Sequence, residues 1–219
     1  MAAIIFDYNG VIVDDEQWQF KAMAAILKQQ GIELSWEQYI DWCLGRPDQT
    51  GFLNIALHYP ALLEGTSLDH IIQQKFEAYQ TLVVDQSLLV PGIIPLIESL
   101  AQHFKLAIVS GALRAEIDAV LQVKNLHNLF SPIITAEDTK KGKPDPEGYQ
   151  LAITLLDISP TEAIVIEDTS VGIIAAQAAG AKCVAVSQTH RPQDLYQADL
   201  ILPRVTDLTI AQLTDLLGK

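Results

Sequence analysis

A series of short apolar runs constrains the fold of this chain more than any other feature of its sequence. Their near-continuous β-branched character is typical of strands in a parallel sheet that is covered on both faces. Segments with apolar residues at helical spacing lie between them, and Gly180 follows the last of these as a C-terminal cap. Strands that alternate with helices predict a doubly wound α/β fold. The expected strands are 2–6, 105–111, 131–138, 163–169, 182–187 and 200–203, and the expected helices are 92–103, 113–124, 147–157 and 170–179.

Residues 15–85 interrupt this alternation just after the first expected strand. Their apolar periodicity predicts helices separated by glycines and prolines, with no strand among them. We therefore predict an α/β core formed by residues 1–14 and 86–219, and a helical insertion formed by residues 15–85. The expected helices of the insertion lie near 15–30, 35–45, 49–58 and 67–81.

The composition narrows the class of protein. Of the 219 residues, 49% are hydrophobic and 19% are charged, which predicts a folded chain rather than a disordered one. The net charge of -13 argues against nucleic acid or an anionic membrane surface as a partner. No apolar run approaches the roughly 18 residues of a membrane span, and the N-terminal segment lacks the pattern of a signal peptide. We therefore expect a cytoplasmic protein in which Cys43 and Cys183 are ordinary buried thiols.

Polar residues stand at the ends of four expected strands, where open parallel sheets bind their ligands. Each of them has a structural explanation when taken singly, as a helix cap, a turn residue or a solvated charge. Together they predict a polar site on one edge of the sheet, and its close acidic residues would repel one another unless a cation lay between them. The residues are Asp7 and Asn9 after the first strand, Ser110 and Gly111 after the second, Lys143 after the third, and Glu167 and Asp168 at the fourth.

Four segments in this order resemble the four motifs of the haloacid dehalogenase-like hydrolases. The segment FDYNGVIVD, with Asp7, resembles the first motif, which is usually written DxDG(T/V)xxxD. VSGA, KGKPDPEGY and VIEDTSVGIIAAQAAGA resemble the second, third and fourth motifs. A lone DxDG match is weak, but an ordered set of four is specific. The resemblance covers essentially the whole chain, and it implies a Rossmann-like core with a helical cap, as in β-phosphoglucomutase and phosphoglycolate phosphatase.

This resemblance implies Mg²⁺-dependent hydrolysis of a small phosphorylated metabolite. Asp7 would be the nucleophile that forms an aspartyl-phosphate. Ser110, Gly111 and Lys143 would bind the phosphoryl oxygens and stabilise charge in the transition state. A monomer or a weak dimer is expected. The metal site would comprise Asp7, the backbone carbonyl of Asn9, Asp168, and Glu167, which would orient metal-bound water.

Asn9 departs from the family pattern. Phosphatases and phosphomutases of the family carry an Asp here as the general acid and base, and a carboxamide cannot take up or release that proton. General acid–base catalysis contributes about 100- to 10,000-fold. The chain is then a slow phosphatase, a scaffold for other chemistry, or a variant engineered to trap a complex. Deamidation before Gly10, which would restore an Asp, is a fourth alternative.

Two cap positions bear on the substrate. Gln19 stands where β-phosphoglucomutase-like members have a His, which weakens a mutase interpretation. Arg46 follows Gly45 in a segment that resembles the substrate-contacting turn of family caps. It either contacts a second anionic group of the substrate or is a solvated surface arginine.

Other members of the family define the alternatives. A phosphonatase-like hydrolase of carbon–phosphorus bonds would need a cap lysine as a Schiff base, whereas Lys21, Lys28 and Lys75 are expected to be solvated helix charges. Dehalogenases work without a metal, and the acidic fourth motif argues against that chemistry. A silent relative that binds a phosphorylated ligand or a protein partner is favoured by Asn9 alone. The intact set of metal and phosphate residues argues against it.

Overall fold

The computed structural model describes residues 1–83, 88–123, 125–188 and 191–218. The chain divides into two compact units, one formed by residues 1–14 with 89–219 and the other by residues 15–88. Leu88 groups with the helical unit, whereas the boundary expected from the sequence places it in the α/β core. That boundary, between residues 85 and 86, lies outside the described residues.

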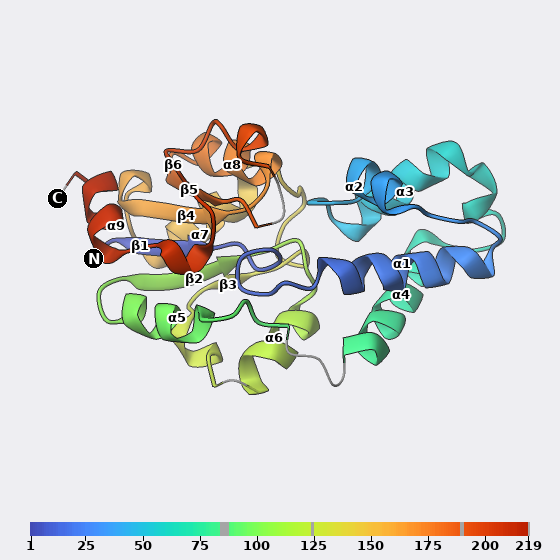
Figure 1. Ribbon diagram of the computed structural model, residues 1–219, viewed down its shortest axis with the longest axis horizontal. Helices are drawn as coiled ribbons and strands as arrows, with labels where there is room; N and C mark the ends of the chain where they lie inside the picture. The colour runs from blue at the N-terminus through green and yellow to red at the C-terminus, as the bar shows by residue number, and fades with distance from the viewer. Residues whose placement is uncertain (84–87, 124, 189–190, 219) are drawn as a thin grey trace. The chain divides into compact units, whose positions relative to one another are not determined.

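The α/β unit contains a parallel sheet with the strand order β3-β2-β1-β4-β5-β6 (Figure 1). This confirms the predicted Rossmann-like doubly wound fold. The chain order reverses between β1 and β4, and such a reversal opens a binding crevice at the carboxyl ends of the strands. The strands are β1 Ala3–Phe6, β2 Lys105–Val109, β3 Ile133–Ile134, β4 Ala163–Glu167, β5 Lys182–Val186 and β6 Leu200–Leu202.

Helices cover both faces of this sheet, α5 and α6 on one face and α7 and α8 on the other (Figure 1). Successive residues of β1 alternate between the faces, so Ala3 and Ile5 pack with α7 and α8 while Ile4 and Phe6 face the other way. All four are fully buried, which explains the uninterrupted apolar run. The helices are α5 Ile93–Ala101, α6 Arg114–Val123, α7 Glu147–Leu156, α8 Ser170–Ala178 and α9 Ile210–Leu216, and the 3-10 turns are η2 His127–Leu129, η3 Pro160–Glu162, η4 Pro192–Asp194 and η5 Val205–Asp207.

Two elements differ from the expectation. Residues 131–138 were expected to form one strand, but only Ile133–Ile134 pair as β3. The backbone N–H and the hydroxyl of Thr135 both donate to Asp138 Oδ2 over 2.8 Å, and these bonds turn the chain away from the sheet. Helix α9 was not expected, although the reciprocal capping bonds of Thr209 and Gln212 start it in a common way.

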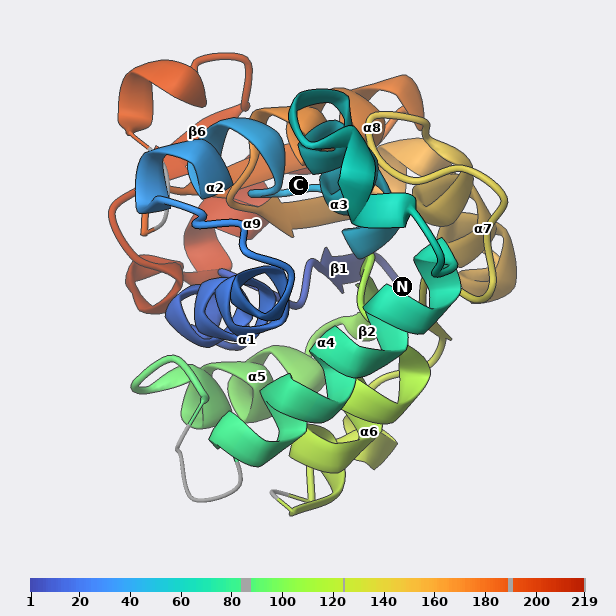
Figure 2. The same cartoon turned by 90° about the vertical axis from the view of Figure 1, so that its right-hand side faces the viewer.

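The helical unit has its own apolar core. Met23 and Leu27 of the first helix pack with Phe52, Ile55 and Ile71 from later helices. Helices α1 and α4 lie against each other, which can be followed in both Figure 1 and Figure 2. Across the described residues, no helix combines the length and the apolarity needed to cross a membrane. The elements are α1 Glu16–Gln29, α2 Trp36–Trp42, α3 Asp48–His58, η1 Pro60–Leu63 and α4 Leu68–Val83.

The central position of β4 leads to a first prediction. Ile164 is fully buried and pairs with Ile4 of β1 and Lys182 of β5. We expect Ile164→Ala to lower the free energy of unfolding by about 2–5 kcal/mol, because the lost methyl groups leave a cavity that the sheet cannot close. Ile174→Ala is the matched control, since Ile174 on α8 is 42% exposed. Urea denaturation of both variants checks this, and equal losses would contradict it.

Candidate active site

The site begins where β1 and β4 end side by side. Their register pairs Phe6 with Ile166, and the N–H of Asp7 donates to the Ile166 carbonyl oxygen over 2.9 Å. This parallel pairing carries Asp7 and Glu167 to the same edge of the sheet, and Asp168 follows directly. All three carboxylates are buried, and each offers an oxygen that lies within 4.8 Å of the others.

The loop after β1 closes on itself above this edge. The N–H groups of Ile12 and Val13 both donate to the Tyr8 carbonyl, over 2.9 and 3.0 Å, and the N–H of Gly10 donates to the Val13 carbonyl over 2.7 Å. Gly10 has a φ of +75°. A Cβ at this position would lie 2.0 Å from Asp168 Oδ2, so the loop can approach the carboxylate only with a glycine here.

Lys143 reaches the same edge from the loop between β3 and α7. Its Nζ donates to Asp7 Oδ1 over 2.7 Å and to Glu167 Oε1 over 2.6 Å. Only 15% of its side chain is exposed, and the Glu167 side chain is fully buried. A single ammonium group therefore bridges two carboxylates that would otherwise repel each other.

Glu167 accepts hydrogen bonds at both of its oxygens. Oε1 accepts from Lys143 and from the hydroxyl of Tyr149, the latter over 2.9 Å. Oε2 accepts from the N–H of Asp168 over 2.9 Å, and from the N–H and the hydroxyl of Thr169 over 3.0 and 2.9 Å. The Thr169 hydroxyl also caps α8 by accepting the N–H of Gly172. This carboxylate is thus held rigidly by protein donors.

Burial and charge shift the pKa values of these groups in opposite directions. Burial raises the pKa of Asp7 to about 7; the nearby Lys143 charge opposes this, and the Glu167 charge adds to it. Burial disfavours a charge on Lys143, but the two carboxylates raise its pKa above its usual value. Burial also favours a neutral Glu167, yet the charge and hydrogen bond of Lys143 hold its pKa below its usual value. The site therefore contains a fixed ion pair beside an easily protonated Asp7.

Ser110 and Gly111 were predicted to stand at the end of the second strand, and Ser110 follows β2 directly. Its side chain is buried, its N–H donates to the Ile134 carbonyl over 3.0 Å, and its Oγ accepts the N–H of Ala112 over 3.0 Å. Gly111 is exposed. Strand order places this loop beside the end of β1. Phosphate binding by these residues and metal binding by Asp168 stay predictions.

In the helical unit, the expectation that Lys75 is a solvated charge is wrong. Lys75 is only 3% exposed, pairs with Asp48 Oδ2 over 2.8 Å, and donates to Gln19 Oε1. Gln19 Nε2 in turn donates to Asp15 Oδ2 over 2.7 Å, and so does the hydroxyl of Tyr79. A Schiff-base lysine needs an accessible amine, whereas Lys75 is buried and bound to Asp48 and Gln19, which argues against the phosphonatase alternative.

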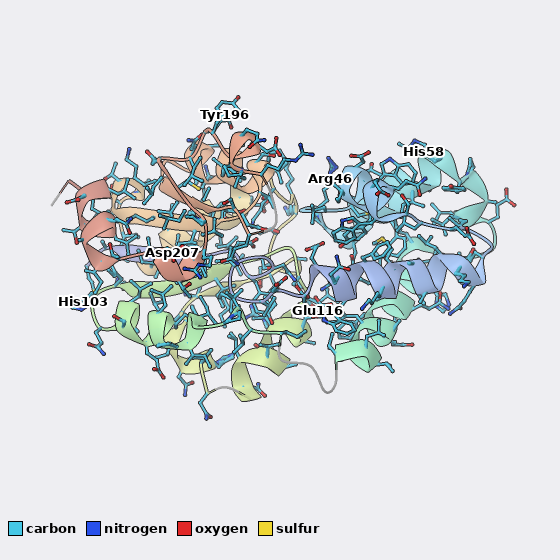
Figure 3. All side chains as sticks on the ribbon, viewed as in Figure 1. Arg46, His58, His103, Glu116, Tyr196 and Asp207 are labelled. Atoms are coloured by element: carbon cyan, nitrogen blue, oxygen red, sulfur yellow. The ribbon has the colours of Figure 1, made fainter. Side chains whose placement is uncertain are left out.

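The remaining helical-unit candidates are at the surface. Lys28 is exposed, and Lys21 lies 4.0 Å from the centre of the Trp18 ring. Arg46 is exposed after α2, as the side chains in Figure 3 show. Its role as a contact for a second anionic group stays a prediction.

Two residues that support the site were not assigned from the sequence. Thr169 carried a signal, because a Thr three residues before Gly172 at the start of an apolar helix indicates an N-cap. Tyr149 lies inside the third motif segment, but nothing in the sequence shows that its hydroxyl reaches Glu167.

Comparison with known proteins places these residues in a family context. Residues 4–186 match the sequence model of a family described as haloacid dehalogenase-like hydrolase. A validoxylamine A 7'-phosphate phosphatase of Streptomyces hygroscopicus subsp. limoneus is 30% identical over 206 residues, which are 93% of this chain and 94% of that protein. The β-phosphoglucomutase of Bacillus subtilis is also 30% identical, over 96% of this chain and 92% of its own length.

Solved structures agree with the fold. The structure of CbbY from Rhodobacter sphaeroides in complex with phosphate has a TM-score of 0.86 against this chain. It is 25% identical, and the comparison covers 97% of this chain and 99% of that one. A protein with the same architecture has therefore been solved with phosphate bound.

The close contact between Gly172 and Glu167 leads to a second prediction. Gly→Ala inside a helix ordinarily stabilises by about 1 kcal/mol. At position 172 a Cβ would lie 1.8 Å from Glu167 Oε1, so we expect Gly172→Ala to destabilise by about 1–3 kcal/mol. Ser170→Ala, an exposed change in the same turn, is the control. Urea melts of both variants measure this, and a more stable Gly172→Ala would refute the contact.

Proposed function

This chain belongs to the haloacid dehalogenase-like hydrolase family, and we propose that it hydrolyses a small phosphomonoester through a covalent intermediate on Asp7. The observation that supports this most directly is the Asp7 carboxylate, held by the Lys143 ammonium over 2.7 Å beside two further buried acids. A relative that is 30% identical is itself named a phosphatase of a phosphorylated small molecule.

Asp7 carries out the first half of the reaction. A carboxylate oxygen attacks phosphorus, the new oxygen–phosphorus bond forms, and the bond to the alkoxide leaving group breaks. Water then attacks the aspartyl-phosphate, which releases inorganic phosphate and restores the carboxylate. Lys143 and Ser110 would balance the charge that spreads over the phosphoryl oxygens in both steps.

The residues at the strand ends also suit a magnesium ion. Asp7 and Asp168 offer hard oxygen donors, and the Asn9 carbonyl would complete the protein's share of ligands. Glycine at position 10 lets the loop that carries the Asn9 carbonyl approach Asp168 Oδ2 closely. When bound, Mg²⁺ would supply positive charge that offsets the repulsion between Asp7 and a phosphate dianion. We assign Glu167 to holding Lys143, in place of the role expected from the sequence of orienting metal-bound water, because both of its oxygens already accept protein hydrogen bonds.

Asn9 limits the rate under this proposal. The leaving oxygen must take up a proton and the attacking water must lose one, and a carboxamide does neither. Substrates with good leaving groups depend least on this transfer, so we propose that they are turned over best. A protein that binds phosphorylated ligands without turnover is the second candidate, and Asn9 is the observation that favours it.

The third prediction tests turnover. We expect a panel of phosphomonoesters with Mg²⁺ to include a substrate that the chain hydrolyses slowly, and Asp7→Asn to abolish its phosphate release. Asn9→Asp restores a proton donor and should raise kcat by about 100- to 10,000-fold. Intact-mass analysis of the unaltered chain is the control, because a mass gain would reveal deamidation. Saturable phosphate binding without hydrolysis in every variant would instead support the binding protein.

The fourth prediction concerns pH. A proton and Mg²⁺ compete for the Asp7 carboxylate. Since burial raises the pKa of Asp7 to about 7, the carboxylate is mostly protonated at pH 6 and mostly ionised at pH 8. We expect the Kd for Mg²⁺, measured by calorimetry, to fall about tenfold between these values. Asp7→Asn should bind weakly with no such pH dependence, and a pH-independent Kd in the unaltered chain would contradict the assignment.

A further inference from the structure

Tyr149 is a buried tyrosine whose hydroxyl points into the acidic site. It is the third residue of α7, it is 1% exposed, and its ring packs among the residues that join α7 to the sheet. Its hydroxyl donates to Glu167 Oε1 over 2.9 Å. A phenylalanine would fill the same space without burying a hydroxyl, so packing alone does not require a tyrosine here.

The same side chain also contacts Lys143. The Nζ of Lys143 lies 5.3 Å from the centre of the Tyr149 ring, within the range of a cation–π interaction. That Nζ and the Tyr149 hydroxyl donate to one oxygen, Glu167 Oε1. Tyr149 thus contacts both the cation and the anion that share this ion pair.

Lys143 needs such support because of its own geometry. Its side chain has a flexible four-carbon stem, and its ammonium has no preferred direction for its three donors. Of its two carboxylate partners, Glu167 is the more firmly held, because Oε2 already accepts from Asp168 and Thr169. A second donor at Oε1 limits how strongly that oxygen draws the ammonium away from Asp7.

We propose that Tyr149 is a positioning residue, which keeps the Lys143 ammonium on the nucleophile Asp7 by sharing Glu167 Oε1 and by presenting its ring to the cation. This role rests on the proposed function, in which Lys143 stabilises charge during phosphoryl transfer. Tyr149 itself takes no part in bond making. Without its hydroxyl, Lys143 moves toward Glu167 and loses its alignment with the reacting phosphoryl group.

Three variants separate the contributions. Tyr149→Phe removes the hydroxyl and keeps the ring, and Tyr149→Leu removes both. Tyr196→Phe deletes the same hydroxyl from a side chain that is 73% exposed and serves as the control. Tyr196 is labelled in Figure 3. Asn9→Asp is the background for kinetics, so that turnover is fast enough to measure. Urea midpoints of each variant report stability separately.

We expect Tyr149→Phe to lower kcat about tenfold, with KM changed less than about twofold, because a misplaced Lys143 mainly affects the transition state. Orthovanadate, which mimics the transferring phosphoryl group, should bind about tenfold more weakly by calorimetry with Mg²⁺, while inorganic phosphate changes less than about twofold. Tyr149→Leu should lower kcat and the affinity for vanadate further than Tyr149→Phe does. Tyr196→Phe should have the same kcat and vanadate affinity as its parent.

The vanadate measurement keeps this proposal separate from the proposed function. If no phosphomonoester is turned over, the phosphatase proposal fails, but weaker vanadate binding by Tyr149→Phe still supports the positioning role. Unchanged kcat and unchanged vanadate affinity in Tyr149→Phe overturn the positioning role. A lower urea midpoint with those two values intact shows a purely structural residue and overturns it as well.

Discussion

The ammonium group of Lys143 lies between the buried carboxylates of Asp7 and Glu167, and the other features of the site follow from that arrangement. Two buried carboxylates without a cation repel each other and lose hydration, so one of them would bind a proton. With Lys143 in place, Glu167 stays ionised while Asp7 remains close to the point of protonation. The site therefore holds one firmly ionised carboxylate, Glu167, beside a second, Asp7, whose pKa lies at about 7.

Backbone N–H groups also stabilise the charge on Glu167, in addition to Lys143. The first N–H groups after β4 point at Glu167, and the start of α8 adds the favourable end of its helix dipole to the same place. Glycines at positions 10 and 172 allow the loop after β1 and the helix α8 to come this close to carboxylates. Side-chain charge, backbone donors and small residues thus act on one edge of the sheet, where four strands end.

The sequence was most informative about the sheet. Buried strands in a parallel sheet are apolar at nearly every position, so β1, β4 and β5 could be predicted from their short apolar runs, and Asp7 and Glu167 from the ends of those runs. The length of β3 could not be predicted, because the bonds between Thr135 and Asp138 compete with the ladder. Partnerships between distant residues were also hidden. Lys75 reads as a surface lysine in α4, and only the folded helical unit shows that it is buried against Asp48 and Gln19.

The strand order has a consequence for how the molecule is assembled during synthesis. Strand β1 leaves the ribosome well before both of its neighbours, Lys105–Val109 and Ala163–Glu167. The helical unit, in contrast, is one uninterrupted stretch of chain, residues 15–88, with local contacts and a core of its own. Contacts between residues far apart in the sequence form slowly, so this unit can fold before β1 pairs with β2 and β4. Until β4 emerges, Asp7 has neither Glu167 nor Asp168 beside it, so the candidate active site is among the last parts of the protein to form.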